Sequence, residues 1–302
     1  MSEVALDPVE PTAADYNARS NDAVKGVIIE IGQTLGSFHG KFAIVGGAVP
    51  WLLLDNEAMP HVGTLDVDIG LDPEALGDGE YATLVGALQK QGYTQSAELR
   101  RFQLERDVDL GDGGPPIRVV VDFLMPRDAA PVKNDPPLVD NFAVMKASGG
   151  DLALLFNQLV EMKGVMPNGI NNKVEIAVCS IPALLAMKGY ALVKRNKQKD
   201  AYDVYYCIRN YPGGAEALAE ACLPLLGHES AREGFDGIRR KFEEFDGYGP
   251  GCVRAFAEEA QILGNRTADE WQQDAFGQVQ AWLGTLERLG SPPSEAATVS
   301  SA

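Results

Sequence analysis

The chain has 302 residues, of which 45% are apolar, aromatic or cysteine and 23% are charged, as in a globular protein with an ordinary core. Forty-three acidic against 26 basic residues give a net charge of −17, which counts against a protein that coats DNA or RNA, because phosphate binding needs a basic surface. A small basic pocket, or carboxylates that hold cations, stays compatible with this charge.

Membrane and zinc-binding classes are also disfavoured. The longest nearly uncharged apolar stretch, from Phe42 to Leu54, is interrupted by Pro50 and is too short to span a bilayer. The acidic N-terminus lacks a secretory signal pattern, so we expect a cytoplasmic protein without a membrane partner. The four cysteines form no CxxC pair, and the three histidines do not cluster with them.

The first half of the chain mixes helix-like and strand-like segments. Apolar residues at helical spacing predict a helix over 22–38, and the β-like run 41–45 ends at a glycine pair. Residues 48–54 and 80–91 are predicted as helices and 64–71 as a strand.

A hairpin and a helical region are predicted next. Strands over 99–106 and 117–124 flank a Gly- and Pro-rich stretch, which favours an antiparallel hairpin with a long loop. One more strand, 173–179, follows an Asn/Gly turn, and from Ile181 onward the pattern is almost wholly helical. The expected segments are a flexible tail over 1–20, an α/β domain over 21–180, a helical domain over 181–289 and a flexible tail over 290–302.

Two aspartates lie on the predicted strand 64–71. Residues two apart in a strand point to the same face, so Asp66 and Asp68 should sit side by side. Like charges at that distance repel, and one carboxylate would be pushed to protonate unless a cation lay between them. The plain alternative is a strand edge with two solvated aspartates.

A third aspartate strengthens the cation hypothesis. Asp122 interrupts an apolar run that is typical of a strand buried on both faces, where a lone carboxylate costs several kcal/mol unless it is paired or binds metal. An Arg partner or backbone N–H groups could also satisfy it. With Asp66 and Asp68 in the same half, we favour a three-carboxylate site for two Mg²⁺ or Mn²⁺ ions, suited to phosphoryl or nucleotidyl transfer.

The glycine pair Gly46-Gly47 follows an apolar strand and precedes a predicted helix. Glycine lets a phosphate approach the backbone N–H groups closely, although a simple tight turn is the commoner explanation of such a pair. Its position on the strand before Asp66 favours the phosphate interpretation.

A basic segment opens the helical half. Lys188 lies among apolar residues, and Arg195 and Lys199 follow it at seven and eleven residues, so all three should share one face if the helix is continuous. A solvated helix face is the usual explanation of such a segment. The apolar setting of Lys188 favours an anionic partner such as a triphosphate.

In this order, the run FAIVGGAV, the segment TLDVDI and the strand with Asp122 resemble the polymerase-β-type nucleotidyltransferase superfamily. The resemblance implies an α+β fold with a mixed sheet and helices, followed by an all-helical C-terminal domain. It also implies that the glycine turn holds a triphosphate and that the three aspartates bind two metal ions. The chain departs from the pattern at Pro50 and Trp51, and at Gly47, where many members have serine.

The segment from Met187 to Asp203 makes the resemblance more specific. Its MKG and KDxxD motifs are similar to those of the AbiEii/AbiGii-type nucleotidyltransferase toxins, the MenT-like group included. The resemblance spans about residues 42–206 and implies that Lys188 contacts the nucleotide. It further implies that Lys199, Asp200 and Asp203 lie on a helix that closes the site, with Asp203 catalytic or supporting.

Together these observations predict a Mg²⁺- or Mn²⁺-dependent nucleotidyltransferase toxin that moves NMP from an NTP to an acceptor hydroxyl, with an RNA end, such as the tRNA 3′ end, or a protein as acceptor. A cognate antitoxin is an expected partner. The predicted catalytic residues are Asp66, Asp68, Asp122, Lys188 and Asp203, and the predicted nucleotide-binding residues are Gly46, Gly47, Thr64, Lys188, Arg195, Lys199 and Asp200.

Two other functions fit the same motifs. A degenerate fold could bind nucleotide or a partner without turnover, which the glycine at position 47 and the acidic surface favour. A transferase that modifies small molecules, such as antibiotics, would use the same chemistry at the phosphate.

Overall fold

The computed structural model describes residues 15–54, 56–76, 79–96, 99–100, 102–128 and 144–290. The tails predicted over 1–20 and 290–302 lie outside these residues, except for 15–20 and Gly290. Helix α1 (Ala18–Thr34) begins within the first of these ranges, and Asn17 caps it by accepting a hydrogen bond from the Ser20 N–H.

In the described part of the chain, seven strands form one mixed sheet in the order β3-β4-β2-β1-β7-β6, with β5 also paired to β4. The β1–β2, β3–β4 and β6–β7 pairs are antiparallel, whereas β1–β7, β2–β4 and β4–β5 are parallel. The strands are β1 Phe42–Val45, β2 Asp66–Leu71, β3 Gln103–Val108, β4 Ile117–Pro126, β5 Met145–Ala147, β6 Asn157–Val165 and β7 Asn171–Cys179.

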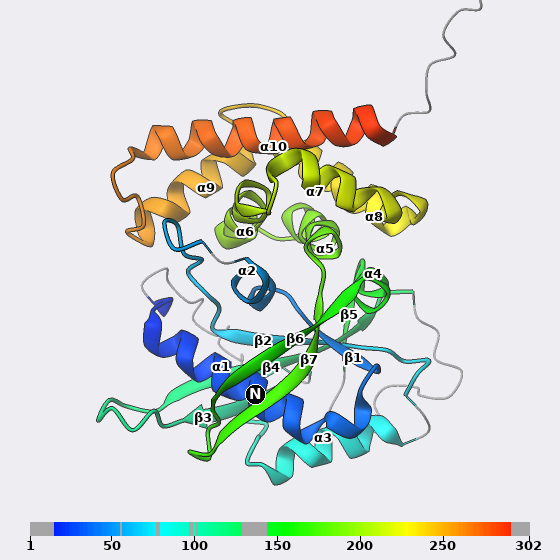
Figure 1. Cartoon of the computed structure of the whole chain (residues 1–302), viewed down its shortest axis with the longest axis vertical. Coiled ribbons are helices and arrows are strands. Elements are labelled where there is room, and N and C mark those ends of the chain that lie inside the picture. Colours follow the sequence, from blue (N-terminus) through cyan, green and yellow to red (C-terminus); the bar gives the residue numbers. More distant parts are fainter. Residues whose placement is uncertain are drawn as a thin grey trace, which may run out of the picture.

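The central strands are apolar because helices cover the sheet on both sides. All four residues of β1 are buried, and Figure 1 shows α1 and α3 below the sheet, with α2 between the sheet and the helices above. Besides α1, the elements are the short 3-10 turn Gly36–Phe38, α2 Ala48–Leu53, α3 Glu80–Lys90 and α4 Gly150–Leu155.

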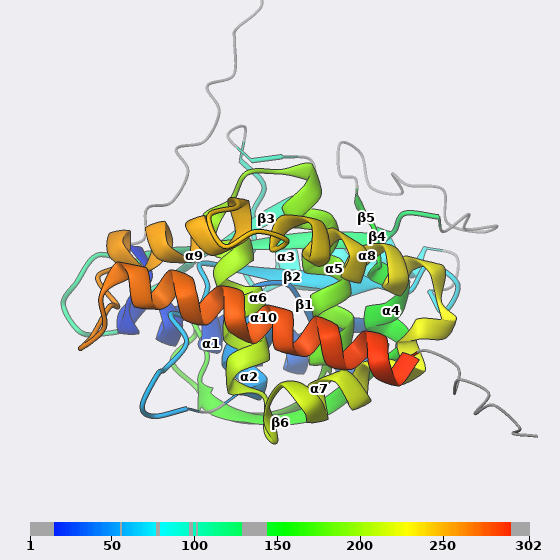
Figure 2. The same ribbon diagram turned by 90° about the horizontal axis from the view of Figure 1, so that it is seen from above.

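The C-terminal half is helical and lies over the sheet (Figures 1 and 2). Its first helix is capped by Ser180, with a proline in the first turn, where a missing N–H costs nothing. The elements are α5 Ile181–Lys194, α6 Gln198–Asn210, α7 Gly214–Cys222, the 3-10 turn Leu223–Gly227, α8 Glu229–Lys241, α9 Tyr248–Glu259 and α10 Ala268–Gly290.

Helices α5 and α8 touch through glycines. A methyl group on Gly189 would lie 1.7 Å from the Gly234 carbonyl oxygen, and one on Gly234 would lie 2.3 Å from the Ala186 carbonyl oxygen. A methyl group on Gly237 would lie 2.5 Å from the Gly189 carbonyl oxygen. The two backbones are therefore in contact, and α8 packs directly against α5.

The predicted fold class is confirmed: a mixed sheet with helices precedes a helical C-terminal region. The predicted hairpin is the β3–β4 pair. The helix predicted over 22–38 instead ends at Thr34 and is followed by a separate 3-10 turn. No element was predicted between 125 and 172, where β5, α4 and β6 lie. No helix among the described residues is both long and apolar enough to cross a membrane.

Candidate active site

The sheet brings the three aspartates onto one face. Asp66 and Asp68 are two residues apart on β2, and the parallel β2–β4 register places Asp68 directly opposite Asp122. Because side chains alternate between faces along a strand and paired residues share a face, all three carboxylates project from the same side. The expected side-by-side arrangement of Asp66 and Asp68 thus extends to the neighbouring strand.

Burial, and after it the neighbouring charges, favours the protonated forms of Asp68 and Asp122. Burial, then the charges of Asp66 and Asp122, raises the pKa of Asp68 well above its usual value. Burial and Asp66 also raise the pKa of Asp122 to about 6, although Gln103 opposes the shift by donating a hydrogen bond of 2.8 Å to the Asp122 carboxylate.

A metal site is not preformed by these side chains. Within the described ranges, no three His, Cys, Asp or Glu side chains are arranged so that they could hold a metal ion as they stand. The backbone positions nevertheless fit a shared site, and the donors are all carboxylate oxygens, which Mg²⁺ and Mn²⁺ prefer.

The turn from β1 to α2 leaves no room for side chains. Gly46 has a φ of 69°, and a methyl group there would lie 1.8 Å from the Asp68 Oδ2 atom. A methyl group on Gly47 would lie 2.8 Å from the Thr64 Oγ1 atom and 3.3 Å from the Lys199 Nζ atom. Thr64 thus takes up the space next to residue 47, and its hydroxyl donates a hydrogen bond of 2.5 Å to Asp66.

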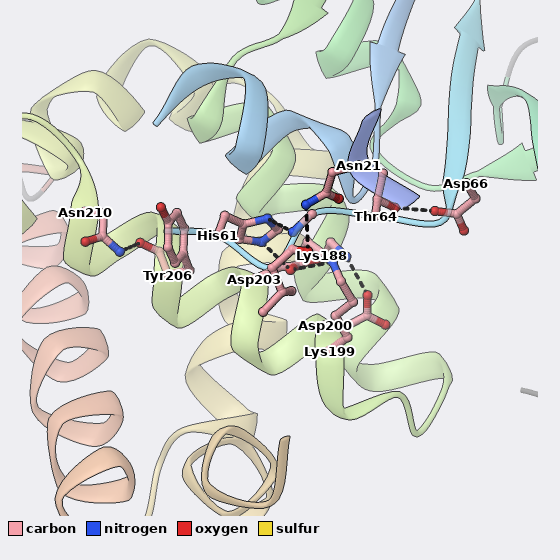
Figure 3. A network of polar contacts seen from close by, with 12 residues as sticks. Asn21, His61, Thr64, Asp66, Lys188, Lys199, Asp200, Asp203, Tyr206 and Asn210 are labelled. Carbon is pink, nitrogen blue, oxygen red and sulfur yellow. Dashed lines mark hydrogen bonds and ion pairs between the residues drawn. The ribbon is translucent and has the colours of Figure 1, made fainter. Parts of the chain in front are cut away.

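Two aspartates of α6 hold three cations (Figure 3 draws the two lysines). Lys188 on α5 lies 2.7 Å from a carboxylate oxygen of Asp200 and 2.7 Å from one of Asp203. Lys199 donates to Asp203 at 2.9 Å, and Arg195 donates two hydrogen bonds to Asp200. The predicted basic residues are therefore gathered into one network with the KDxxD aspartates.

These ion pairs keep both aspartates ionised. Burial alone would raise the pKa of Asp203, but Lys188, Lys199 and His61 hold it well below its usual value. Lys188 and Arg195 outweigh burial in the same way and lower the pKa of Asp200 to about 2. With its oxygens occupied by cations and a donor, Asp203 is suited to positioning the lysines and not to accepting a proton.

The condition for a shared face, a continuous helix through the basic segment, is not met. Helix α5 ends at Lys194, Arg195 is extended with φ −141° and ψ 160°, and α6 begins only at Gln198. Arg195 donates a hydrogen bond to Asp200 across this break. This contact, and not a continuous helix, brings Arg195 to the network. Lys188 and Lys199 consequently reach the network from different helices.

The structure adds His61, which the sequence did not single out. Its Nε2 atom lies 3.0 Å from Asp203 Oδ1, while its Nδ1 atom accepts a hydrogen bond from the Gly63 N–H. Burial lowers its pKa to about 4, so the imidazole is neutral at pH 7 and donates through Nε2. His61 thus joins the segment before β2 to α6, and a single histidine in a loop gave no pattern that could have revealed this.

Tyr16 is the second addition. Lys199 Nζ lies 5.4 Å from the centre of the Tyr16 ring, and the ring meets Phe256 edge-on at 6.1 Å. Burial, followed by the charge of Asp66, raises the pKa of its hydroxyl above the ordinary value. Tyr16 lies in the segment predicted as a flexible tail, where the composition gave no sign of a residue at the site.

One cavity of about 210 Å³ joins these groups. This is below the roughly 300 Å³ of the smallest typical ligand pockets, so a nucleotide that occupies the cavity would also extend beyond it into solvent. Asp122 lies on the strand beside it but is not among the lining residues. The predicted site residues that line it are Gly46, Gly47, Thr64, Asp66, Asp68, Lys188, Arg195, Lys199, Asp200 and Asp203.

Comparison with known proteins identifies one family. A sequence-family model described as nucleotidyl transferase AbiEii toxin, type IV toxin–antitoxin system, matches residues 74–280. The expected span was about 42–206, so the match reaches further into the helical region but begins after Gly46, Gly47, Asp66 and Asp68. None of the curated proteins matches the chain.

Solved structures resemble the chain only distantly. JHP933 from Helicobacter pylori has 10% identity and a TM-score of 0.45, with 90% of this chain and 95% of that chain covered. An antigenic nucleotidyltransferase-like protein from Paracoccidioides brasiliensis has 16% identity and a TM-score of 0.43, with 73% and 88% covered. A further H. pylori structure with nucleotidyltransferase in its description has 10% identity and a TM-score of 0.44, with 91% and 100% covered. Because these scores are low, the family assignment depends on the sequence match.

Proposed function

The chain belongs to the AbiEii family of nucleotidyltransferase toxins of type IV toxin–antitoxin systems, and we propose that its pocket transfers NMP from an NTP to a hydroxyl at the tRNA 3′ end. One observation supports this most directly. Asp66, Asp68 and Asp122 project from one face of the sheet, and across the cavity lie the cations Lys188 and Lys199. Anionic donors facing cations fit a substrate made of a metal-bound triphosphate.

We propose that Asp66, Asp68 and Asp122 hold two Mg²⁺ ions. Burial and mutual repulsion raise the pKa of Asp68, and a divalent cation near these oxygens would remove that penalty. When bound, Mg²⁺ supplies charge stabilisation at the transferred phosphoryl group. Thr64 orients the Asp66 carboxylate through its hydroxyl, and the absence of a side chain at Gly46 leaves room for Asp68.

The triphosphate would lie between the glycine turn and the helical half. The Gly46-Gly47 backbone can approach phosphate oxygens closely, and Lys199 lies immediately beside position 47. Arg195, whose side chain is 54% exposed, can contact phosphate while it keeps its bond to Asp200. Lys188 is nearly buried between two carboxylates, so it acts on the substrate mainly through its charge.

Asp122 is the candidate general base for the attacking hydroxyl. Without a bound cation the Asp122 carboxyl has a pKa of about 6, so it is mostly ionised at neutral pH and can accept a proton, and a cation held by the same carboxylate would lower that pKa. Asp203 does not fit this role, because its two oxygens already bind Lys188, Lys199 and His61.

An RNA end suits the charge of the molecule better than a long stretch of RNA. A net charge of −17 opposes extended contact with phosphates, whereas a terminus can enter a locally cationic pocket. A protein hydroxyl is the alternative acceptor, and an antitoxin encoded beside the toxin is the expected cellular partner.

The test is incubation of the purified protein with each labelled NTP, Mg²⁺, total RNA and cell protein, followed by location of the label. We expect label at tRNA 3′ ends, no incorporation by Asp66→Ala, and normal incorporation by the matched surface variant Asp236→Ala. Label found only in protein would overturn the tRNA assignment. Wild-type incorporation by a folded Asp66→Ala would overturn the carboxylate site.

A further inference from the structure

The cavity has a second end, which the proposed chemistry does not use. Away from the aspartates it is lined by Leu124, Met145, Ala147, Met187 and Ala191. We propose that this apolar arm is the nucleobase subsite and that Lys194 and Ser148 at its end select the base. The inference rests on the proposed nucleotidyl transfer and specifies where the nucleoside lies.

Helix α5 connects the two ends of the cavity. Leu184, Met187, Lys188, Ala191 and Lys194 all line it, at the three- and four-residue spacing of one helix face. Lys188 turns to the α6 carboxylates, while Lys194 lies six residues further on, or roughly 9 Å along the axis. That separation is of the size of a nucleoside, so one helix can serve phosphates at one point and a base at the other.

The opposite wall continues directly from the carboxylates. Leu124 is two residues beyond Asp122 on β4 and therefore shares its face, and it pairs with Met145 on the neighbouring strand. A ligand whose α-phosphate lies at the aspartates would thus place its nucleoside against Leu124. The flexible side chains of Met145 and Met187 can adapt to a flat ring from either side.

The far end of the arm offers hydrogen-bond donors to a ligand. Lys194 donates a hydrogen bond of 2.6 Å to the Ser148 hydroxyl. An ammonium group has three N–H donors, and a serine hydroxyl that accepts one bond can still donate its own proton. Two N–H donors of Lys194 and the hydroxyl of Ser148 therefore remain for a ligand, which complements a base edge with carbonyl or ring-nitrogen acceptors and disfavours an exocyclic amine at that point.

Charge also separates the two ends. The acidic residues that line the cavity, Asp66, Asp68, Asp200 and Asp203, belong to β2 and α6, whereas the charged lining residues closest in sequence to the apolar ones are Lys146, Lys188 and Lys194. A second metal-bound group is therefore not expected in the arm, and an uncharged ring with acceptor atoms fits it.

The test compares binding of non-hydrolysable analogues of the four NTPs, and of inorganic tripolyphosphate, in the presence of Mg²⁺. Variants Lys194→Met and Ser148→Ala should reduce the discrimination among the four nucleotides by about tenfold, as expected for loss of a charged hydrogen bond. Their affinity for tripolyphosphate should stay within about twofold of wild type, because the phosphates lie elsewhere. Lys163→Met, at a lysine that is 73% exposed on β6, is the matched control and should change neither.

A second variant tests the shape of the arm. Ala191→Phe should fill it, so that every nucleotide binds no better than tripolyphosphate while tripolyphosphate still binds. Unchanged nucleotide discrimination in Lys194→Met, together with active NMP transfer, would overturn the subsite and leave the proposed function intact. A rise in KM for the RNA acceptor alone would instead show that the arm receives the acceptor. Absence of both tripolyphosphate binding and transfer in the wild-type protein would overturn the proposed function and the subsite with it.

Discussion

At the scale of single residues, the shape of the pocket depends on two positions that lack a side chain. Gly46 and Gly47 carry no side chain because the oxygens of Asp68 and Thr64 already fill the space where one would lie. A serine at position 47, as many polymerase-β-type enzymes have, would place its Cβ 2.8 Å from the Thr64 hydroxyl oxygen, so local packing favours glycine there. The departure at position 47 therefore has a packing reason and does not by itself indicate lost activity.

A single added methyl group tests whether residue 46 must lack a side chain. Gly46→Ala would strain a φ of 69° by about 1–2 kcal/mol and would press against the Asp68 carboxylate. We expect a lower Tm and a loss of NMP transfer of more than about tenfold. Gly86→Ala, in the middle of α3 with open space around it, should raise stability by about 0.5–1 kcal/mol. Thermal unfolding and NMP transfer of both variants check this, and normal activity of Gly46→Ala would contradict it.

The crowded carboxylates predict a pH-dependent stability difference. Asp122 has a pKa of about 6 in the folded protein and about 3.9 in an unfolded chain, so the folded state binds its proton more tightly. Its ionisation therefore lowers the free energy of unfolding as pH rises from about 4 to about 6, by about 3 kcal/mol. Without divalent ions, Asp122→Asn should be more stable than wild type at pH 7.5 and no more stable near pH 4.

Magnesium provides the control for that prediction. Addition of Mg²⁺ at pH 7.5 should raise the Tm of the wild-type protein more than that of Asp122→Asn, because the variant has lost an anionic ligand. Calorimetry at the two pH values, with and without Mg²⁺, measures both effects. Equal shifts in the two proteins would show that Asp122 does not contribute to cation binding.

Residues with a periodic or charge signal were predictable, and isolated ones were not. The two-residue spacing of Asp66 and Asp68 indicated a shared face, and the apolar surroundings of Asp122 marked it as unusual. His61 and Tyr16 stand in loop-like sequence, and only the tertiary structure brings them to Asp203 and Lys199. A sequence pattern describes neighbours along one element, so contacts made between loops and distant helices are invisible to it.

At the scale of elements, two helices and the extended linker between them carry the basic residues that line one side of the cavity. Asp203 on α6 binds Lys188 from α5, and Asp200 binds both Lys188 and Arg195 of the linker. The position of α6 relative to α5 is therefore fixed by buried ion pairs, and these pairs also set where the positive charge faces the cavity.

Removal of one of these charges should be costly. Asp203→Asn would leave Lys188 and Lys199 buried with one fewer anion, so we expect a loss of about 3–5 kcal/mol in the free energy of unfolding. The folded pKa of Asp203 lies below its unfolded value of about 3.9, so the loss should be fully present near pH 7 and should shrink as the pH falls below about 4.

The matched control is an exposed pair. Asp236→Asn, whose partner Arg240 is 60% exposed, should cost less than about 1 kcal/mol. Urea unfolding of both variants at several pH values makes the comparison. A similar small effect of the two substitutions would show that the buried network does not hold α5 and α6 together.

The predictability of an element depended on its apolar pattern. Strand β4 and helix α5 were placed well because their apolar residues are continuous or regularly spaced. Strand β6 was missed because most of its side chains are exposed, so that no alternation of buried residues marks it. The break between α5 and α6 was not located because its residues, 195–197, include no glycine or proline that would mark it in the sequence.

At the scale of the whole molecule, a strongly acidic protein encloses a cationic patch. The cavity takes its lining from the sheet on one side and from α5 and α6 on the other, so neither half completes it alone. We propose that the boundary near residue 180 separates two kinds of secondary structure without separating two functions. The net charge of −17 then acts on the approach of anionic substrates and not on the site itself.

Ionic strength should reveal this arrangement. A rise in KCl from about 10 to about 100 mM shortens the Debye length from about 30 to about 10 Å and weakens the repulsion between the acidic surface and RNA. At fixed free Mg²⁺, kcat/KM for the RNA acceptor should rise or stay within about twofold of its starting value. A fall of more than about tenfold, measured in the same assay, would mean that many phosphates are contacted along the RNA.

The glycine contact between α5 and α8 has a consequence for how the chain tolerates change. Gly189, Gly234 and Gly237 touch backbone atoms of the opposite helix, and Gly189 directly follows Lys188. In a library of random variants selected for toxicity, these three positions should accept no other residue, although none of the three lines the cavity. Such a selection would identify the α5–α8 contact as essential, although it lies far along the chain from Asp66, Asp68 and Asp122. These glycines would be required because the two backbones touch, and not because they act on the substrate.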